Sequence, residues 1–389
     1  MFTPAWTASP QLPAEGFTPN WSQEGFWRQS LRQAVRLTAG GDRVRVRLSN
    51  AYGTSPLRIA GATVARAGEG AAIEPGSLRR LTFDGAASAE IPARGHAVSD
   101  PAELTLEPRE SVTVTLHLDA VTGPATFHAQ AFATSHRAPG DRLEDVRGEA
   151  FDASSESWYF LSAVEVDTGR RDAVALFGDS ITDGFGSTPG ANRRWSDALA
   201  ERTGRPVLNA GIGGNLLLND SAWYGEKGVH RLGRDVLDHQ GVDTLVVLQG
   251  LNDIGFSETD EQPTYKPAPI VEADELIDGY RELIRQARAR GLRVIGSTLL
   301  PFGGSDHWGE HAAKVSREVN EWIRGAGEWD AAVDLNRVLA DPGDPDRLHP
   351  AYDFGDHLHP NDKGYLVMAE ALAELLQPNR FGTVSAGPL

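Results

Sequence analysis

The chain has 389 residues, of which 40% are hydrophobic, so it can bury more than one core and two domains are expected. Its formal net charge of −17 argues against nucleic acid or an anionic membrane as a partner. Cysteine is absent, which excludes disulfides, a thiolate nucleophile and cysteine-ligated zinc.

The start of the chain has no basic segment followed by an apolar run, and no later window approaches the length of a membrane-spanning helix. We therefore expect a soluble protein with no membrane partner. It would be cytoplasmic by default, and secreted if an upstream signal peptide has been removed. The oligomeric state stays open.

Residues 1–167 show the period-two patterning of short strands. Residues 44–48 alternate apolar side chains with arginine, and residues 112–118 alternate apolar with polar side chains. Residues 57–64 and 125–132 are further candidate strands with Gly or Pro nearby. Short strands separated by turn signals, without a convincing helix, predict an all-β sandwich of jelly-roll type that serves as an accessory domain.

Residues 168–389 are expected to form a second domain, in which strands and helices alternate. The expected strands are residues 173–177, 206–209, 243–249, 292–299 and 331–335. The expected helices lie near residues 194–202, 227–238, 271–290, 312–324 and 361–376, the last with Asn361 as its N-cap. This alternation is typical of a parallel sheet with helices on both faces and predicts a flavodoxin-like, three-layer α/β/α fold.

A serine follows the first of these strands. Residues 173–177 are continuously apolar, as expected for a strand buried on both faces, and Ser180 comes next in a Gly-Asp-Ser turn. The carboxyl ends of parallel strands are where α/β sheets place reactive groups. The alternative is an ordinary turn in which Ser180 or Thr182 caps the following helix.

Three further segments follow in order, at residues 209–215, 250–253 and 356–359. They read Asn-Ala-Gly-Ile-Gly-Gly-Asn, Gly-Leu-Asn-Asp and Asp-His-Leu-His. Together with the turn at Ser180, they resemble the four sequence blocks of the SGNH, or GDSL-type, serine hydrolase family. The chain also resembles a branch of that family, the xylan-associated arylesterases and acylhydrolases, in which a β-domain precedes the hydrolase domain.

The resemblance implies a role for each matching residue. Ser180 would be the nucleophile, His359 the general base and Asp356 the residue that orients His359. The oxyanion would be held by the backbone N–H groups of Ser180 and Gly214 and by the side-chain amide of Asn252. These assignments suit the residue types, because glycine lets the backbone approach a substrate and an amide donates a hydrogen bond without titrating.

Neighbouring residues leave alternatives open. Gly211 and Gly213 compete with Gly214 for the donor role, whereas Asp179 and Asp183 are expected to form turns and to support the site rather than to react.

A group of acidic residues and histidines near residues 349–359 could instead be a ligand set for zinc or manganese, as in a metal-dependent hydrolase. The group consists of His349, Asp353, Asp356, His357 and His359. The serine mechanism is complete without a metal, so we expect no metal and no cofactor.

The function expected is hydrolysis of short-chain acyl, aryl or O-acetylated sugar esters, with a small-molecule or carbohydrate ester as the partner. The competing hypothesis is a carbohydrate-binding or adhesion protein with an inactive hydrolase domain. Several tryptophans of the first domain could stack on sugars, although aromatic side chains in a β-sandwich more often pack in its core. They are Trp6, Trp21, Trp27 and Trp158.

Overall fold

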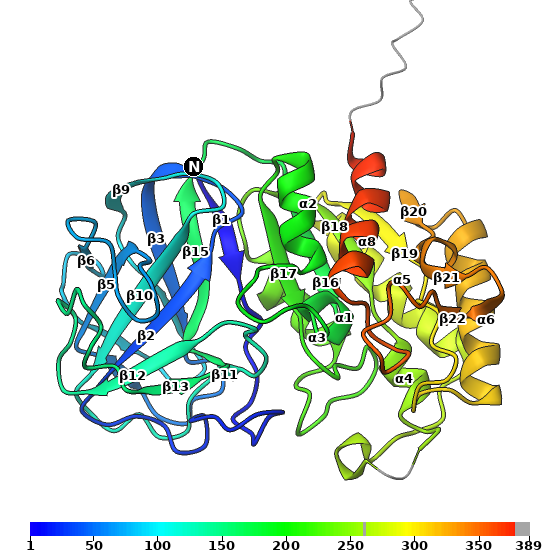
Figure 1. Ribbon diagram of the computed structural model, residues 1–389, viewed down its shortest axis with the longest axis horizontal. Helices are drawn as coiled ribbons and strands as arrows, with labels where there is room; N and C mark the ends of the chain where they lie inside the picture. The colour runs from blue at the N-terminus through cyan, green and yellow to red at the C-terminus, as the bar shows by residue number, and fades with distance from the viewer. Residues whose placement is uncertain (260–261, 378–389) are drawn as a thin grey trace, which may run out of the picture.

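A computed structural model describes residues 1–259 and 262–377 of the chain. Figure 1 shows a part built of strands, from β1 to β15, beside a part in which strands and helices alternate. No helix in these two ranges is long and apolar enough to cross a membrane.

Two antiparallel sheets make up most of the N-terminal part. The first has the order β1-β15-β3-β8, with β9 also paired to β3, and the second has the order β13-β12-β2-β10-β5-β6. The strands of the first sheet are β1 (Phe2–Thr7), β3 (Gly41–Ser49), β8 (His96–Val98), β9 (Ala102–Leu106) and β15 (Leu161–Asp167). The strands of the second sheet are β2 (Gln29–Arg36), β5 (Gly61–Arg66), β6 (Arg79–Leu81), β10 (Ser111–Leu118), β12 (Ser135–Pro139) and β13 (Ala153–Ser155).

Two smaller antiparallel pairs complete this part. They are β4 (Leu57–Ile59) with β7 (Ala89–Ile91), and β11 (Phe127–His128) with β14 (Trp158–Tyr159). The strand expected over residues 57–64 is thus two strands, β4 and β5. The strand expected over residues 125–132 is only β11, because the chain turns away and Phe132 adopts a left-handed φ of 48°.

Alternation of apolar residues explains the core of the N-terminal part. Val44, Val46 and Leu48 on β3 are fully buried in it. The tryptophans divide into two groups: Trp27 is 57% exposed, while the others belong to the core. The buried ones are Trp6, Trp21 and Trp158.

The C-terminal part contains a parallel sheet of order β17-β16-β18-β19-β20. Its strands are β16 (Ala173–Gly178), β17 (Val207–Gly211), β18 (Val242–Leu248), β19 (Arg293–Ser297) and β20 (Ala331–Val333). In chain order this is 2-1-3-4-5, the flavodoxin-like arrangement, so the prediction of an α/β fold with a parallel sheet in this part is confirmed. Every residue of β16 is buried, as its continuous apolar run predicts.

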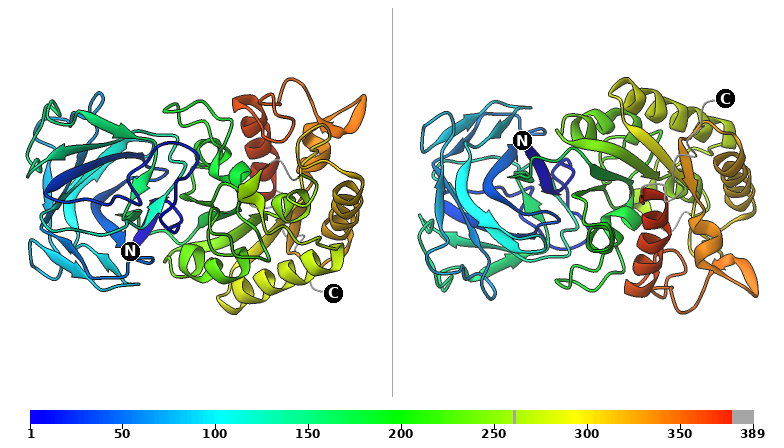
Figure 2. Two further views of the ribbon diagram at one scale, coloured as in Figure 1. Left: turned by 90° about the horizontal axis from the view of Figure 1, so that it is seen from below. Right: turned by 90° about the horizontal axis from the view of Figure 1, so that it is seen from above.

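Helices cover both faces of this sheet, and Figure 2 shows α8 and α5 on opposite sides of it. The α-helices are α1 (Ser180–Asp183), α2 (Trp195–Thr203), α3 (Gly228–Leu232), α4 (Leu251–Gly255), α5 (Ala273–Ala289), α6 (Glu310–Gly325), α7 (Leu335–Leu339) and α8 (Asp362–Leu376). Asn361 caps α8, as expected, by accepting from the N–H groups of Lys363 and Gly364.

Some short elements differ from the expectation. The helix expected over residues 227–238 is α3 followed by a π-helical turn, η1 (Gly233–Leu237). A 3₁₀ turn, η2 (Pro263–Tyr265), and a hairpin of β21 (Ala340–Asp341) and β22 (Asp344–Leu348) complete the elements.

Side chains of the N-terminal part bond to the backbone of β17, which is an edge strand of the parallel sheet. The hydroxyl of Thr38 accepts from the Val207 N–H at 3.0 Å and lies 3.1 Å from the Val207 carbonyl oxygen. The hydroxyl of Thr7 donates to the Asn209 carbonyl at 3.0 Å. These contacts satisfy backbone groups that an exposed edge would leave open.

Candidate active site

The predicted site residues come from separate loops and short helices, which meet at the carboxyl end of the parallel sheet. Ser180 begins α1 directly after β16, Gly214 follows β17, and Asn252 lies in α4 after β18. Asp356 and His359 lie in the loop before α8. All five line one cavity of about 360 Å³, so the carboxyl ends of the strands bring together residues that are far apart in the sequence.

Ser180, His359 and Asp356 form a continuous chain of hydrogen bonds. Ser180 Oγ lies 2.8 Å from His359 Nε2, and His359 Nδ1 lies 2.7 Å from Asp356 Oδ2. The second oxygen, Asp356 Oδ1, accepts from the backbone N–H groups of Leu358 at 3.0 Å and His359 at 2.9 Å. The carboxylate therefore holds both the ring and the backbone of the histidine, which is the geometry that a serine nucleophile needs.

The charge of Asp356 is stabilised by these bonds. Partial burial acts to raise its pKa, but the hydrogen bond and charge interaction with His359 outweigh it, and the pKa of Asp356 falls to about 2. The residue is therefore a carboxylate over the pH range in which His359 could act as a base.

The turn at the nucleophile is capped by the residue before the serine. Asp179 is the N-cap of α1, and its carboxylate accepts from the Ile181 N–H at 3.0 Å. The alternative in which Ser180 or Thr182 caps the next helix is therefore not what the structure has. Burial raises the pKa of Asp179 to about 7.

The position of Gly214, in the loop after β17, leaves no room for a side chain. Gly214 has a φ of 73°, and a Cβ there would lie 2.3 Å from the ring of Tyr224. Its two competitors already donate their N–H groups, Gly211 to Asn209 Oδ1 at 2.9 Å and Gly213 to Asp183 Oδ2 at 3.1 Å. For the Gly214 N–H, no acceptor occurs in the described part of the chain.

Asn252 and its neighbour bind the loop that carries this glycine. Asn252 Nδ2 donates to the Asn215 carbonyl at 3.0 Å. The carboxylate of Asp253 accepts from the backbone N–H groups of Leu217 and Leu218 at 2.8 and 3.0 Å. Burial raises the pKa of Asp253 to about 7. The short helix α4 thus positions both the amide and the glycine loop.

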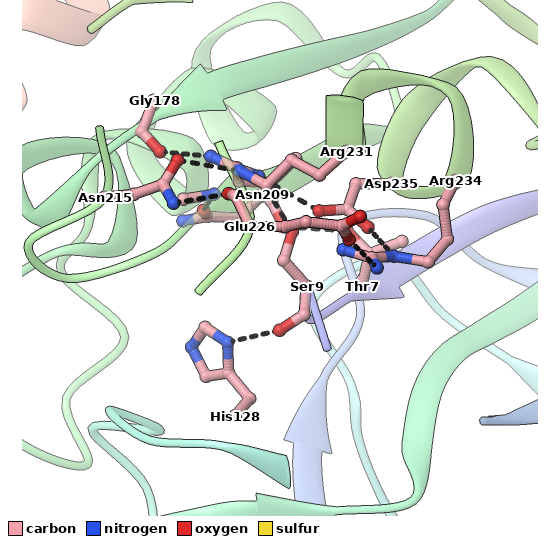
Figure 3. A network of polar contacts seen from close by, with 12 residues as sticks. Thr7, Ser9, His128, Gly178, Asn209, Asn215, Glu226, Arg231, Arg234 and Asp235 are labelled. Carbon is pink, nitrogen blue, oxygen red and sulfur yellow. Dashed lines mark hydrogen bonds and ion pairs between the residues drawn. The ribbon is translucent and has the colours of Figure 1, made fainter. Parts of the chain in front are cut away.

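A buried arginine that belongs to no recognised sequence motif joins the strand ends beneath the site (Figure 3). Arg231 on α3 is fully buried and donates to the Gly178 carbonyl at 2.7 Å and the Ala210 carbonyl at 2.8 Å. It also donates to Asn215 Oδ1 at 2.8 Å and pairs with Asp235 at 3.0 Å. One guanidinium therefore fixes the ends of β16 and β17 and the loop after Gly214.

A histidine of the N-terminal part reaches the same loop. His128 Nε2 lies 3.0 Å from Asp183 Oδ1, and His128 Nδ1 lies 3.0 Å from the Ser9 carbonyl, a contact drawn in Figure 3. Both partners are acceptors, so both ring nitrogens donate and the ring is an imidazolium. Burial acts to lower the pKa of His128, but the charge of Asp183 and the hydrogen bonds to Asp183 and Ser9 together outweigh it, and the pKa is raised. Through Asp183, this ion pair supports Gly213.

Aromatic side chains form part of the cavity wall, and two residues of the wall come from the N-terminal part. Those two are Phe17, which stacks on Tyr224 with ring centroids 5.7 Å apart, and Gln130. Short sequence motifs gave no signal for either residue. The remaining aromatic side chains of the wall are Phe185, Tyr224, Phe256 and Tyr265.

The other histidines near residue 359 take no part in the cavity wall. His357 Nδ1 lies 2.6 Å from Asp353 Oδ2, and the His357 side chain is 46% exposed. His349 Nδ1 accepts from the Ala351 N–H at 3.0 Å. Within residues 1–259 and 262–377, no group of three or more His, Cys, Asp or Glu side chains is arranged to hold a metal ion.

Comparison with known families gives one match in the region that holds this cavity. Residues 176–367 match the GDSL-like Lipase/Acylhydrolase family. The chain contains a GDSL-like hydrolase domain. The predicted family is therefore confirmed, and the protein is a hydrolase. No curated protein matches the chain.

Several solved structures are similar to about half of the chain. A putative lipolytic protein of the G-D-S-L family from Desulfitobacterium hafniense is 18% identical, covers 52% of this chain and 98% of its own, and has a TM-score of 0.40. An aryl esterase from M. smegmatis is 16% identical, covers 53% of this chain and 98% of its own, and has a TM-score of 0.41. An acetyl xylan esterase is 20% identical, covers 53% of this chain and 100% of its own, and has a TM-score of 0.40.

Proposed function

We propose that this GDSL-like hydrolase is a serine esterase that cleaves carboxylic esters. Ser180 attacks the ester carbonyl while His359 takes its proton and later returns it to the leaving alcohol, and Asp356 orients His359 and stabilises its charged form. The oxyanion is held by the N–H groups of Ser180 and Gly214 and by Asn252 Nδ2. Water then attacks the acyl-enzyme while His359 takes its proton; the acid is released, and the proton returns from His359 to Ser180 Oγ.

The observation that carries the proposal is the hydrogen bond of 2.8 Å between Ser180 Oγ and His359 Nε2. The other nitrogen of the same ring is hydrogen-bonded to Asp356. A serine hydroxyl is a weak nucleophile unless a base takes its proton. The lone pair of His359 Nε2 is directed at this hydroxyl because the carboxylate holds a proton on Nδ1. The free N–H of Gly214, in the same cavity, supports its place among the oxyanion donors.

The proposed substrates are short-chain acyl, aryl or O-acetylated sugar esters. A cavity of about 360 Å³ suits a small ester group, and its aromatic wall suits a flat or apolar substrate part. No nucleic acid and no membrane is proposed as a partner, since the net charge of −17 disfavours binding to nucleic acid and to anionic membranes.

The N-terminal part is proposed to be an accessory domain over residues 1–167, built as a β-sandwich of jelly-roll type, with the hydrolase domain over residues 168–389. The last strand of the antiparallel sheets, β15, ends at Asp167, and the first strand of the parallel sheet, β16, begins at Ala173. We propose that this accessory domain shapes the substrate cavity, because Phe17 and Gln130 line it.

Replacement of the nucleophile tests the proposal. Ser180→Ala is expected to reduce kcat on nitrophenyl acetate by about 10³-fold or more, because the remaining groups only bind the substrate. Ser257→Ala is the matched control, since its hydroxyl bonds the Ile254 carbonyl and does not line the cavity. Melting temperatures verify that both variants are folded. A Ser180→Ala protein that keeps more than about 5% of activity would overturn the mechanism.

A further inference from the structure

The amide proposed to hold the oxyanion has a buried histidine on its other side. His307 is 1% exposed, and its Nε2 lies 3.1 Å from Asn252 Oδ1. The ring also packs edge-on against Phe256 and Tyr265, with centroids 5.5 Å from each. His307 is outside the segments that resemble the hydrolase family, and the proposed mechanism does not use it.

The orientation of the Asn252 amide follows from its two partners. Asn252 Nδ2 donates to the Asn215 carbonyl, which can only accept, so the nitrogen must be on that side. Asn252 Oδ1 then faces His307 Nε2. Because an amide oxygen also only accepts, the hydrogen of this contact belongs to His307 Nε2.

The other ring nitrogen of His307 also faces an atom that can only accept a hydrogen bond. His307 Nδ1 lies 2.6 Å from Asp306 Oδ1. The hydrogen bond from His307 is the largest influence on Asp306 and lowers the pKa of that carboxyl, so Asp306 is ionised and can only accept. His307 Nδ1 therefore also carries a hydrogen. A histidine that donates from both nitrogens is an imidazolium.

We propose that His307 is a positioning residue for ester hydrolysis: held as an imidazolium by Asp306, it fixes the Asn252 amide so that the second N–H of Nδ2 points into the cavity. This inference rests on the proposed oxyanion role of Asn252. The positive charge on the oxygen side of the amide polarises it, and an N–H of a polarised amide donates more strongly to an oxyanion.

The arrangement fails when His307 loses its proton. Neutral His307, still donating to Asp306 from Nδ1, turns the lone pair of Nε2 toward Asn252 Oδ1, and two acceptors then face each other. Rotating the amide relieves this contact, but it points Oδ1 toward the Asn215 carbonyl and the cavity. The oxyanion then loses its side-chain donor, so kcat falls on the alkaline side.

Titratable groups face the His307 ring from several segments of the chain. Asp306 contacts Nδ1, and the Tyr265 hydroxyl donates to Asp306 Oδ2 at 3.2 Å. The triad carboxylate Asp356 interacts electrostatically with Asp306. The helix α4 packs against the ring at Gly255. Apart from the neutral phenol of Tyr265, these groups are acids, which stabilise a neighbouring imidazolium when they are ionised.

Two substitutions separate the charge of His307 from its hydrogen bond. His307→Gln keeps an N–H donor for Asn252 Oδ1 without a titrating group, and His307→Phe keeps a ring but no donor. His311→Gln is the matched control, because His311 Nε2 bonds the Val271 carbonyl and does not line the cavity. Each variant is assayed for kcat and KM between about pH 5 and pH 10 by titration of the released acid.

We expect His307→Phe to lower kcat by about 10- to 100-fold with KM changed less than about threefold, a loss smaller than that of a direct oxyanion donor. His307→Gln should recover most of kcat at neutral pH and lack the alkaline decline of the unaltered protein. His311→Gln should keep the kcat of the unaltered protein and the same dependence of kcat on pH. Nitrogen NMR of the unaltered protein at neutral pH should show both nitrogens of His307 protonated.

Unchanged kcat in His307→Phe, or an alkaline decline that persists in His307→Gln, would overturn the inference. If His307→Phe does not fold, the dependence of kcat on pH in His307→Gln tests the inference by itself. The proposed function fails separately: an active Ser180→Ala protein, or an Asn252→Ala protein without a loss of about 10²- to 10³-fold, contradicts the mechanism itself. A large loss in Asn252→Ala beside none in His307→Phe refutes only the role of His307.

Discussion

At the scale of single residues, two neighbouring histidines differ in what their rings contact. His359 lies between Ser180 and Asp356, inside the cavity. His357 is bonded to Asp353 and is half exposed. A serine mechanism uses one imidazole with a free lone pair, whereas a zinc site would recruit several histidines of the 349–359 segment.

The serine mechanism therefore predicts unequal losses. His359→Ala should be nearly inactive, and His357→Ala should keep most activity, because only His359 contacts the nucleophile. The measurements are kcat/KM of each variant and activity after prolonged dialysis with a chelator. Loss of activity on chelation, restored by zinc or manganese and shared by both variants, would favour a metallohydrolase instead.

At the scale of elements, the sequence predicts those that are long or strongly apolar. The five strands of the parallel sheet, and helices such as α5, follow from continuous apolar runs or from helical spacing. The helices α1 and α4 are too short to show a period, although both begin at recognised motifs. The motifs also locate the cavity, since Ser180, Gly214, Asn252, Asp356 and His359 all line it.

The supporting contacts could not be predicted because they join distant segments without a motif. His307 contacts Asn252 across 55 positions of sequence, and His128 contacts Asp183 across the same separation. Arg231 looks in the sequence like any polar residue of a surface helix. Only the fold shows that it is fully buried.

The ion pair of His128 with Asp183 gives a prediction about pH. The pKa of His128 is raised in the folded state, so the pair's contribution is complete below about pH 6.5, the usual pKa of histidine in an unfolded chain. It is lost as pH rises through the raised folded-state value. His128→Gln should therefore lower stability by about 3 kcal/mol at pH 6, because it leaves a buried carboxylate without its charge partner.

Urea unfolding at pH 6 and pH 9.5 measures this effect, with exposed His230→Gln as the control. The difference in free energy of unfolding between the unaltered protein and His128→Gln should be smaller at the higher pH. His230→Gln should match the unaltered protein at both pH values. A difference of equal size at both pH values would show that His128 is neutral when folded.

At the scale of the whole molecule, the N-terminal part contacts the hydrolase domain at the edge of its sheet and lines part of its cavity. Thr7 and Thr38 bond the backbone of β17, and Phe17 and Gln130 line the cavity. A chain that begins at Arg170 would expose the edge of β17 and remove one wall of the cavity.

We therefore expect the chain that begins at Arg170 to aggregate or, if soluble, to melt at a lower temperature with reduced kcat/KM. The measurements are solubility, melting temperature and hydrolysis of nitrophenyl esters, compared with the full chain. A soluble shortened protein with unchanged kinetics and melting temperature would contradict the proposal that the N-terminal part shapes the site.

The pairing of β1 with β15 sets the order in which the chain can fold during synthesis. Phe2 lies opposite Asp167 in that pairing, so β1 cannot pair until the chain has grown past Asp167. Closing so long a loop costs conformational entropy before the contacts that stabilise it have formed. Topologies rich in such long-range pairings therefore fold slowly. On the ribosome, β1 therefore remains unpaired until β15 has been made, and a chaperone can bind it throughout that time.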